Sequence, residues 1–216
     1  DMFEGQQMVI VGRYRKAGTG KIHISGDVAG KVQSFEFTAE LTDKSPDQSL
    51  AFVEKLWASR RIGEIIDELD LKGHNDELVE ELVALSTKHG ILTPYTSFLA
   101  DETVDIRDRT ANAAAATDNL EMLQETSGES AFFQRQVKAG LQLGDQAEMP
   151  AVRGLDGAEV SEVPVENVRN LGSKSFYRRN NQWVDAAVDE EAEQNAIPVV
   201  QFSDEYFELA SQHGGQ

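Results

Sequence analysis

The apolar residues of this 216-residue chain change their spacing after about residue 42, and this change restricts the fold more than any other feature. In VQSFEFTAEL (32–41), Phe35 and Phe37 alternate with polar residues, the two-residue period of a strand with one buried face. After the loop DKSPDQS (43–49), apolar residues recur every three or four positions, as on an amphipathic helix. Strands, then helices, then strands again predict an α+β fold.

The first forty residues favour an antiparallel meander of three strands. QMVIVGRY (7–14) is rich in β-branched residues, and KIHISGDV (21–28) alternates. The turn signals AGTG (17–20) and Ala29-Gly30 separate the three segments. We expect one face of this meander to be buried.

Two helices are predicted over Ser49–Leu69 and Asn75–His89, with Gly73 ending the first. Asn75 is a good N-cap, because its side chain can accept a hydrogen bond from a free helix amide. Gly90 is a natural residue to follow the helix, in the left-handed conformation. The short connection between the helices predicts an antiparallel pair.

The middle of the chain is polar. DIRDRTANAAAATDNLEM (105–122) favours a helix, although it offers few large apolar groups for docking, and the segment is a candidate for mobility. A second helix is predicted for 128–148. The stretch Met149–Gly172, with scattered Pro, Gly and Val, is interpreted as a linker.

The C-terminal part returns to strands. Asn180-Asn181 predicts a hairpin turn, since Asn tolerates positive φ. An acidic loop (189–195) and a short strand, IPVVQF (197–202), should follow. Ser203 can cap a last helix over 204–213. These late strands can cover the exposed edges of the N-terminal meander, so we expect a sheet or β-sandwich built from both ends of the chain.

Four segments follow from these patterns. They are a β meander (1–45), a helical hairpin with a strand (46–102), a helical and linker region (103–173), and a C-terminal hairpin, strand and helix (174–216).

KHGILTPYTSFLADE (88–102) is the strongest candidate for chemistry. A hydrolase can be imagined with Ser97 or Thr96 as the nucleophile and His89 as the base. Such a nucleophile needs a base within reach and a third group to orient that base. No Gly-x-Ser-x-Gly turn surrounds Ser97, and His89 should point away from a helix end.

A structural interpretation of the same stretch is simpler. Gly90 ends a helix and Pro94 favours extended chain before it. Tyr95, Ser97 and Leu99 would then share one face of a strand. We prefer this interpretation and expect a chain that is not an enzyme.

Other sites find little support. The chain has no cysteine, which excludes thiolate catalysis, disulfides and cysteine-bound zinc. Phosphate-binding Gly-rich loops, His-Glu-x-x-His and Asp-x-Asp-x-Asp-Gly are also absent. His23 is expected to be a surface or rim histidine. Arg60-Arg61 can bind an anion, but pairing with nearby carboxylates is favoured. We therefore predict no catalytic, cofactor-binding or metal-binding residues.

The net charge of −18 argues against nucleic acid or anionic lipid as a partner. Residues 180–216 hold eight Asp or Glu and no Lys or Arg, which indicates solvation rather than a diffuse cation site. No run of about 18 apolar residues predicts a membrane helix. Because the chain begins with Asp1 rather than Met, we expect an excised or processed piece of a longer protein, so the absence of a signal peptide says nothing about the parent protein.

One family resemblance is specific. The stretch Phe52–Glu102 resembles the segment that follows the von Willebrand factor A domain in inter-alpha-trypsin-inhibitor heavy-chain-like proteins, many of them bacterial. The motifs that carry it are Leu56-Trp57-Ala58, Arg61-Ile62-Gly63, Gly90-Ile91 and Thr93-Pro94-Tyr95-Thr96-Ser97. The start and the tail of the chain also look like parts of such proteins, whereas 103–171 matches only loosely.

The resemblance implies a region C-terminal to the A domain in a secreted, periplasmic or cell-envelope protein. The A domain and the preceding vault/inhibitor-type β domain would be its partners in the parent chain. The metal motif Asp-x-Ser-x-Ser and the coupling motif Asp-Pro-His-Phe are both absent here, so neither metal-dependent adhesion nor covalent coupling is implied for these residues.

The predicted function is therefore a non-enzymatic structural and interaction region that supports an A domain in adhesion or protein binding. An alternative is an autonomous glycan- or peptide-binding module that uses exposed aromatic rings such as Trp183, Tyr177 or Tyr206. For these rings, core packing is the preferred interpretation. A hydrolase using Ser97 or Thr96 is the remaining alternative.

Overall fold

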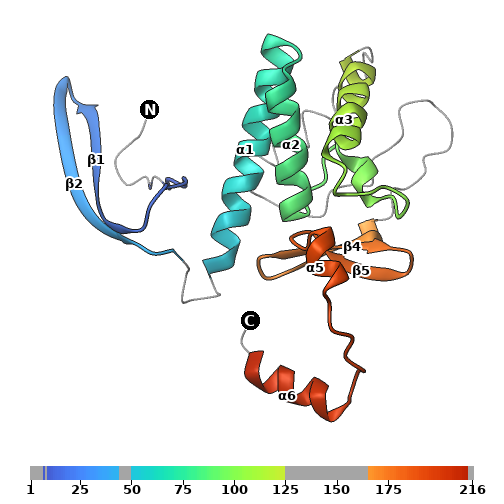
Figure 1. Ribbon diagram of the computed structural model, residues 1–216. Coiled ribbons are helices and arrows are strands. Elements are labelled where there is room, and N and C mark those ends of the chain that lie inside the picture. Colours follow the sequence, from blue (N-terminus) through green and yellow to red (C-terminus); the bar gives the residue numbers. More distant parts are fainter. Residues whose placement is uncertain (1–6, 8, 44–49, 125–164, 214–216) are drawn as a thin grey trace. The chain divides into compact units, whose positions relative to one another are not determined.

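A computed structural model describes residues 7, 9–43, 50–124 and 165–213. It confirms the α+β class, with helices and two antiparallel sheets (Figure 1). The chain divides into two compact units, residues 1–53 and 54–216. The predicted helix at 128–148 and the linker up to residue 164 lie outside the described residues.

The first unit is a β-hairpin. Strands β1 (Gly18–Val28) and β2 (Lys31–Leu41) pair antiparallel, from Gly18 opposite Leu41 to Val28 opposite Lys31. The predicted turn at Ala29-Gly30 is confirmed, with φ of 53° and 77°. The amide of Gly30 donates to Asp27 Oδ1 at 2.7 Å and closes the turn.

The predicted third strand is wrong. The described residues of 7–14 carry no strand, and a bend at residues 15–16 leads into β1. A β-branched run has strand propensity, yet a strand also needs a neighbour that takes its backbone hydrogen bonds. The strands of the two chain ends form separate sheets, each hydrogen-bonded within itself rather than shared.

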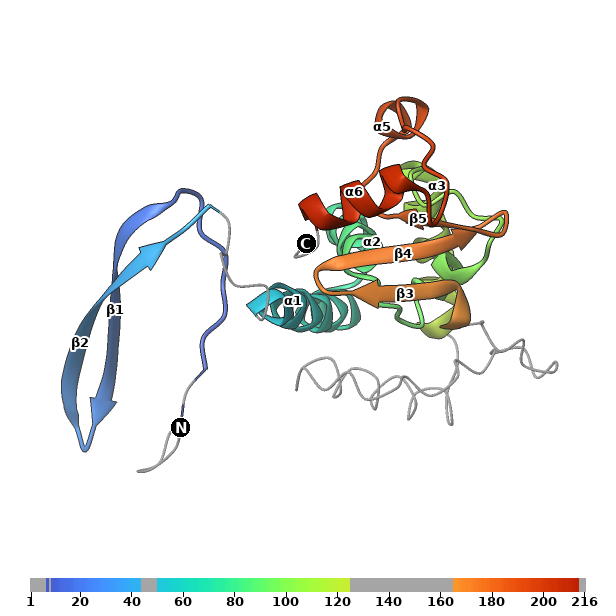
Figure 2. The same ribbon diagram turned by 90° about the horizontal axis from the view of Figure 1, so that it is seen from below.

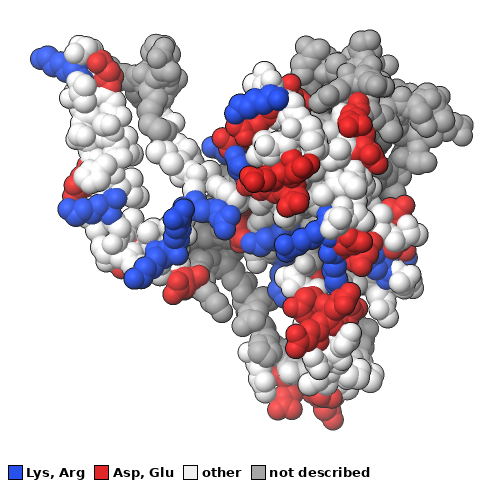
Figure 3. Space-filling view, turned by 45° about the horizontal axis from the view of Figure 1, so that its top comes forward, with Lys and Arg blue, Asp and Glu red and all other residues white. Residues whose placement is uncertain are grey.

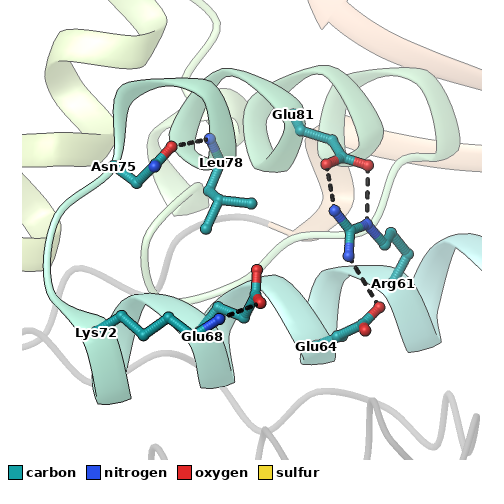
Figure 4. Close-up of polar contacts among 7 residues, drawn as sticks. All are labelled: Arg61, Glu64, Glu68, Lys72, Asn75, Leu78 and Glu81. Atoms are coloured by element: carbon teal, nitrogen blue, oxygen red, sulfur yellow. Dashed lines mark hydrogen bonds and ion pairs between the residues drawn. The ribbon is translucent and has the colours of Figure 1, made fainter.

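The helical pair of the second unit is close to the prediction. Helices α1 (Ala51–Lys72) and α2 (Asp76–His89) flank Gly73, which has φ 86°. Asn75 caps α2 by accepting a hydrogen bond from the Leu78 amide at 3.0 Å (Figure 4), and Gly90 ends the helix in the left-handed conformation.

Ion pairs establish that these helices run antiparallel. Lys88 Nζ lies 2.6 Å from Glu54 Oε1, and Arg61 Nη2 lies 2.6 Å from Glu81 Oε2. The start of α1 therefore meets the end of α2. Between them lies the main apolar core, whose fully buried members include Ala58, Ile62, Ile65, Leu69, Val79 and Leu82.

The Ala-rich segment forms helix α3 (Arg109–Gln124) and docks despite its small side chains. Ala116 and Leu120 are buried in the main core, and Asn119 Nδ2 donates to the Tyr95 carbonyl at 3.2 Å. Small residues let helices approach closely, so the lack of large apolar groups did not prevent packing.

A three-stranded antiparallel sheet, β3 (Val168–Leu171), β4 (Lys174–Arg179) and β5 (Gln182–Asp185), lies across one end of the helices (Figures 1 and 2). The turn at Asn180-Asn181 is confirmed, with φ of 48° and 64°. The prediction that Met149–Gly172 is a linker is wrong at its end, because a short 3-10 helix (Val165–Asn167) and strand β3 lie there. A strand of four residues is too short to show the alternation of apolar and polar residues from which a strand is predicted.

Two more expectations for the tail are wrong, and one is confirmed. The acidic loop contains helix α5 (Glu190–Gln194), capped by Asp189, because carboxylates suit a helix N-terminus. IPVVQF forms no strand, since Pro198 lacks a backbone donor and no neighbouring strand pairs with it. Ser203 caps helix α6 (Asp204–His213) by accepting from the Tyr206 amide at 3.1 Å, as predicted.

Candidate functional site

The hydroxyl-rich stretch 93–97 is a hydrogen-bonded junction rather than a strand. Thr93, Thr96 and Ser86 are fully buried. The Thr93 and Thr96 hydroxyls lie 2.9 Å apart, and the Thr96 hydroxyl donates to Ser86 Oγ at 3.2 Å. Because threonine hydroxyls also accept from local backbone amides, the chain turns here and continues as a 3-10 helix (Ser97–Ala100). The predicted strand is therefore wrong.

The sheet completes this junction. The hydroxyl of Tyr177, a fully buried residue of β4, lies 3.1 Å from the Ser86 carbonyl and 3.0 Å from the Thr87 carbonyl. These carbonyls belong to the last turn of α2, where the Ser86 carbonyl also accepts from the amides of Gly90 and Ile91. Burial raises the pKa of Tyr177, so its hydroxyl stays protonated and donates. Tyr177 thus belongs to the core, as predicted for this ring.

The structure does not join the imagined nucleophiles to a base. Ser97 Oγ lies 3.4 Å from the Pro94 carbonyl. His89 is 5% exposed, and its Nε2 lies 4.0 Å from the carboxylate oxygen Oε1 of Glu54. Among the described residues no hydrogen bond links His89 to Ser97 or Thr96. Burial, followed by the charge of Lys88, lowers the pKa of His89 and keeps its imidazole neutral near pH 7.

Arg61 pairs with carboxylates, as we preferred. Its Nε and Nη2 atoms hold the two oxygens of Glu81 at 2.9 and 2.6 Å, and Nη1 holds Glu64 at 2.9 Å (Figure 4). The bond to Glu81 raises the pKa of Arg61 further. The Arg61 guanidinium therefore links α1 to α2 through its ion pair with Glu81. Arg60 Nε is buried without a hydrogen-bond partner.

His23 is exposed, with Nε2 3.2 Å from Glu36 Oε2 across the hairpin. Within the described ranges, no group of three or more His, Asp or Glu residues is placed to hold a metal ion. None of the described helices is both long enough and apolar enough to cross a membrane.

The other two aromatic candidates are only partly covered. Trp183 is 38% exposed, with the guanidinium of Arg169 4.5 Å from its ring centroid. Tyr206 is also exposed and meets Phe202 and Phe207 edge-on, at interplanar angles of 69° and 80°. Core packing is therefore wrong for these two rings. The α6 rings do not form the coplanar platform that a sugar would stack on.

One side of the hairpin in the first unit is an exposed apolar surface. Because directly paired residues project to the same side of a sheet, Ile22 faces Phe37 and Ile24 faces Phe35 on one side of the hairpin. Ile22, Phe35 and Phe37 are 46%, 50% and 53% exposed. We call this surface the hairpin face. The alternation predicted the face correctly but placed it in a core.

The opposite side of the hairpin is polar. Lys21 Nζ lies 2.7 Å from Glu36 Oε1, and Thr19 donates to Glu40 at 3.0 Å. The hairpin is thus amphipathic, with its charged side paired and its apolar side open. Such an arrangement is typical of a surface that contacts another protein.

The class of proteins to which this chain is similar is the inter-alpha-trypsin inhibitor heavy chains. It is 28% identical over 123 residues to inter-alpha-trypsin inhibitor heavy chain H3 of Rattus norvegicus, and 25% identical over 121 residues to heavy chain H3 of Bos taurus. In both cases the match covers 51% of this chain and spans 14% of the heavy chain. No protein-family model and no solved structure matches the chain. The similarity points to a protein-interaction region.

Proposed function

We propose that this chain is a non-enzymatic interaction region of a multidomain secreted, periplasmic or cell-envelope protein of bacterial type. It follows a von Willebrand factor A domain and supports that domain in adhesion or protein binding. The observation that carries the proposal is the hairpin face, an open row of paired apolar side chains. The similarity to heavy chains of much greater length supplies the context.

The hairpin face needs a cover for its own stability. A two-stranded hairpin alone is marginally stable in water, and a third strand, a second sheet or a helix is needed to bury its apolar side. Phe35 and Phe37 are each about half exposed. Burying the remaining apolar area gains roughly 25 cal/mol per Å². A β domain beside the A domain, packed as the second layer of a sandwich, would provide this cover.

Co-expression of the chain with the A domain and β domain of its parent protein tests this role. We expect a complex, and a melting temperature above that of either part alone. Phe37→Asp puts a charge on the hairpin face and should abolish both effects. Thr38→Asp is the matched control, because the neighbouring residue projects to the polar side opposite Lys21. If the wild-type parts show neither contact nor mutual stabilisation, the supporting role is wrong.

A hydrolase using Ser97 or Thr96 is a weaker proposal, since no described contact brings a base to either hydroxyl. Ser97→Ala with unchanged hydrolysis of ester substrates would end it. An autonomous glycan- or peptide-binding module has one favourable observation, the exposed stack of Arg169 on Trp183. Binding of a glycan or peptide array by wild type but not by Trp183→Ala would support that alternative.

A further inference from the structure

Helix α6 carries an apolar surface that contacts little besides itself. Every side chain from 204 to 212 is exposed. Phe202, Tyr206 and Phe207 form a cluster in which ring centroids lie 5.4 to 6.4 Å apart. Leu209 is three positions after Tyr206 and extends the same stripe. A ten-residue helix is unstable alone in water, so this stripe favours a docked state.

Carboxylates flank the stripe. Asp204 is three positions before Phe207, and Glu205 is four positions before Leu209, so both lie beside apolar members. Glu208, four positions after Asp204 and three after Glu205, lies between these two carboxylates on the side of the helix away from Tyr206. Because residues 180–216 contain no Lys or Arg, the charge of α6 is not balanced locally. Acidic side chains are visible across the surface shown in Figure 3. A surface that receives this helix should be apolar with a positive edge.

The outer side of the β3–β4–β5 sheet has this chemistry. Tyr177 is buried on the inner side, toward α2. The pleat therefore turns its neighbours outward, where Arg178 is opposite Trp183. Arg169 stacks on the Trp183 ring from β3, and Leu171, two positions further, is 67% exposed. We call this surface the sheet face.

The charges of the sheet face leave one cation for a partner. Lys174 Nζ lies 3.1 Å from Asp185, and Arg178 Nε lies 3.4 Å from Glu102. Among the described residues, Arg169 contacts the Trp183 ring and no carboxylate. A guanidinium stacked on an aromatic ring still directs its N–H donors outward, where a carboxylate can accept them.

We propose that two copies of this chain exchange their C-terminal helices, so that α6 of each copy lies on the sheet face of the other. Tyr206 and Leu209 then cover Trp183 and Leu171. Both complementary surfaces belong to the same chain and both are exposed in it, which favours a second copy as the partner. A two-fold axis repeats each contact. Because each contact occurs twice, the buried area is doubled. Two helices, each about 15 Å long, then contribute to it, which brings the total closer to the area of a stable interface.

Paired charge reversals test the exchange. Sedimentation equilibrium of the full chain should show a dimer. The sheet variant, Arg169→Glu, should weaken dimerisation at least tenfold. The helix variant, Asp204→Lys with Glu205→Lys, should do the same. An equimolar mixture of the two variants should restore the dimer, because each of its two contacts then joins opposite charges.

The controls keep the experiment decisive. Glu80→Lys with Glu121→Lys makes the same change in net charge as the helix variant, on exposed residues of α2 and α3 away from the contact, and its dimer should be retained. Circular dichroism identifies any variant that does not fold, and the restored mixed dimer shows directly that both variants are folded. A wild-type chain that is monomeric at all concentrations, or variants that remain monomeric when mixed, would overturn the proposal.

Discussion

Replacing Gly90 with alanine isolates the contact that joins α2 to the β3–β4 sheet. Gly90 has φ 58°, and a Cβ atom placed there would overlap the side-chain amide of Asn170 and lie 3.0 Å from Ser175 Oγ. Ser175 is 2% exposed and has little room to withdraw, whereas Asn170 is exposed and its side chain can rotate away. The substitution therefore displaces the Asn170 amide and crowds Ser175.

The cost has two parts. A left-handed conformation costs an alanine roughly 1 kcal/mol relative to glycine. The Asn170 amide, in the orientation that satisfies its neighbours, donates to the His89 carbonyl at 3.3 Å and to Ser175 Oγ at 2.9 Å. Displacing it costs about 1 kcal/mol more for lost hydrogen bonding, and the overlap adds a similar packing term. We expect Gly90→Ala to lower the free energy of unfolding by about 2–4 kcal/mol.

Gly73 provides a matched control. It also has a positive φ, 86°, and also follows a helix, but a Cβ atom there would meet nothing within 4 Å. Gly73→Ala should therefore lose only the conformational part, about 1 kcal/mol. Urea unfolding followed by circular dichroism measures both variants. Equal losses for the two would refute the argument that Gly90 is required by close approach to Asn170. Asn170→Ala in the Gly90→Ala background should recover part of the loss.

Three further predictions concern the second unit. Tyr177→Phe should cost about 1 kcal/mol, because the end of α2 loses the hydrogen bond from this hydroxyl while the Ser86 carbonyl still accepts from the Gly90 and Ile91 amides; a neutral result in urea unfolding would contradict that bond. For His89 the folded pKa is below the unfolded value of about 6.5, so the unfolded chain binds more protons and stability is lost as pH falls through the interval between the two values. His89→Gln should weaken the pH dependence of the free energy of unfolding in that interval. If the free energies of unfolding of wild type and variant differ by the same amount from pH 7.5 to 5, the role of His89 is wrong. Arg61→Gln should cost about 1 kcal/mol, less in 1 M NaCl, since Glu81 and Glu64 are partly exposed; a loss that does not change with salt would argue against an ionic staple.

The helical pair was readable from the sequence because its signals are local. Asn75 and Gly90 act through hydrogen bonds and dihedral angles within a few residues, and the apolar stripe needs only its own period. The Asn180-Asn181 turn is local in the same way. These features make the α+β class and the order of the elements predictable.

The stretch 93–100 was misread because its structure depends on distant partners. Thr93 and Thr96 were assigned to a strand, yet Ser86 in α2 accepts from Thr96, and Tyr177 in β4 closes the same junction. Neither partner is visible from local spacing. The same holds for β3, which exists because β4 pairs with it, and for IPVVQF, which lacks a pairing strand.

The candidate interaction surfaces were predicted only in part. Alternation in β2 places Phe35 and Phe37 on one side of the hairpin, but a period says nothing about what covers that side. Likewise, Tyr206 looked like a core residue because aromatic side chains are usually buried. The exposed fraction of each side chain in the structure is needed to distinguish a buried core residue from one on a surface that can bind a partner.

The two proposed contacts make separable demands on the chain. The hairpin face lies in the first unit and is purely apolar, so its contact should depend on buried area and little on salt. The α6 exchange combines apolar burial with opposite charges and should respond to charge reversal. Phe37→Asp should therefore leave the dimer of the full chain intact, and the Arg169→Glu variant should still bind the neighbouring domains. If either variant abolishes both associations, a single shared interface must replace the two proposed here.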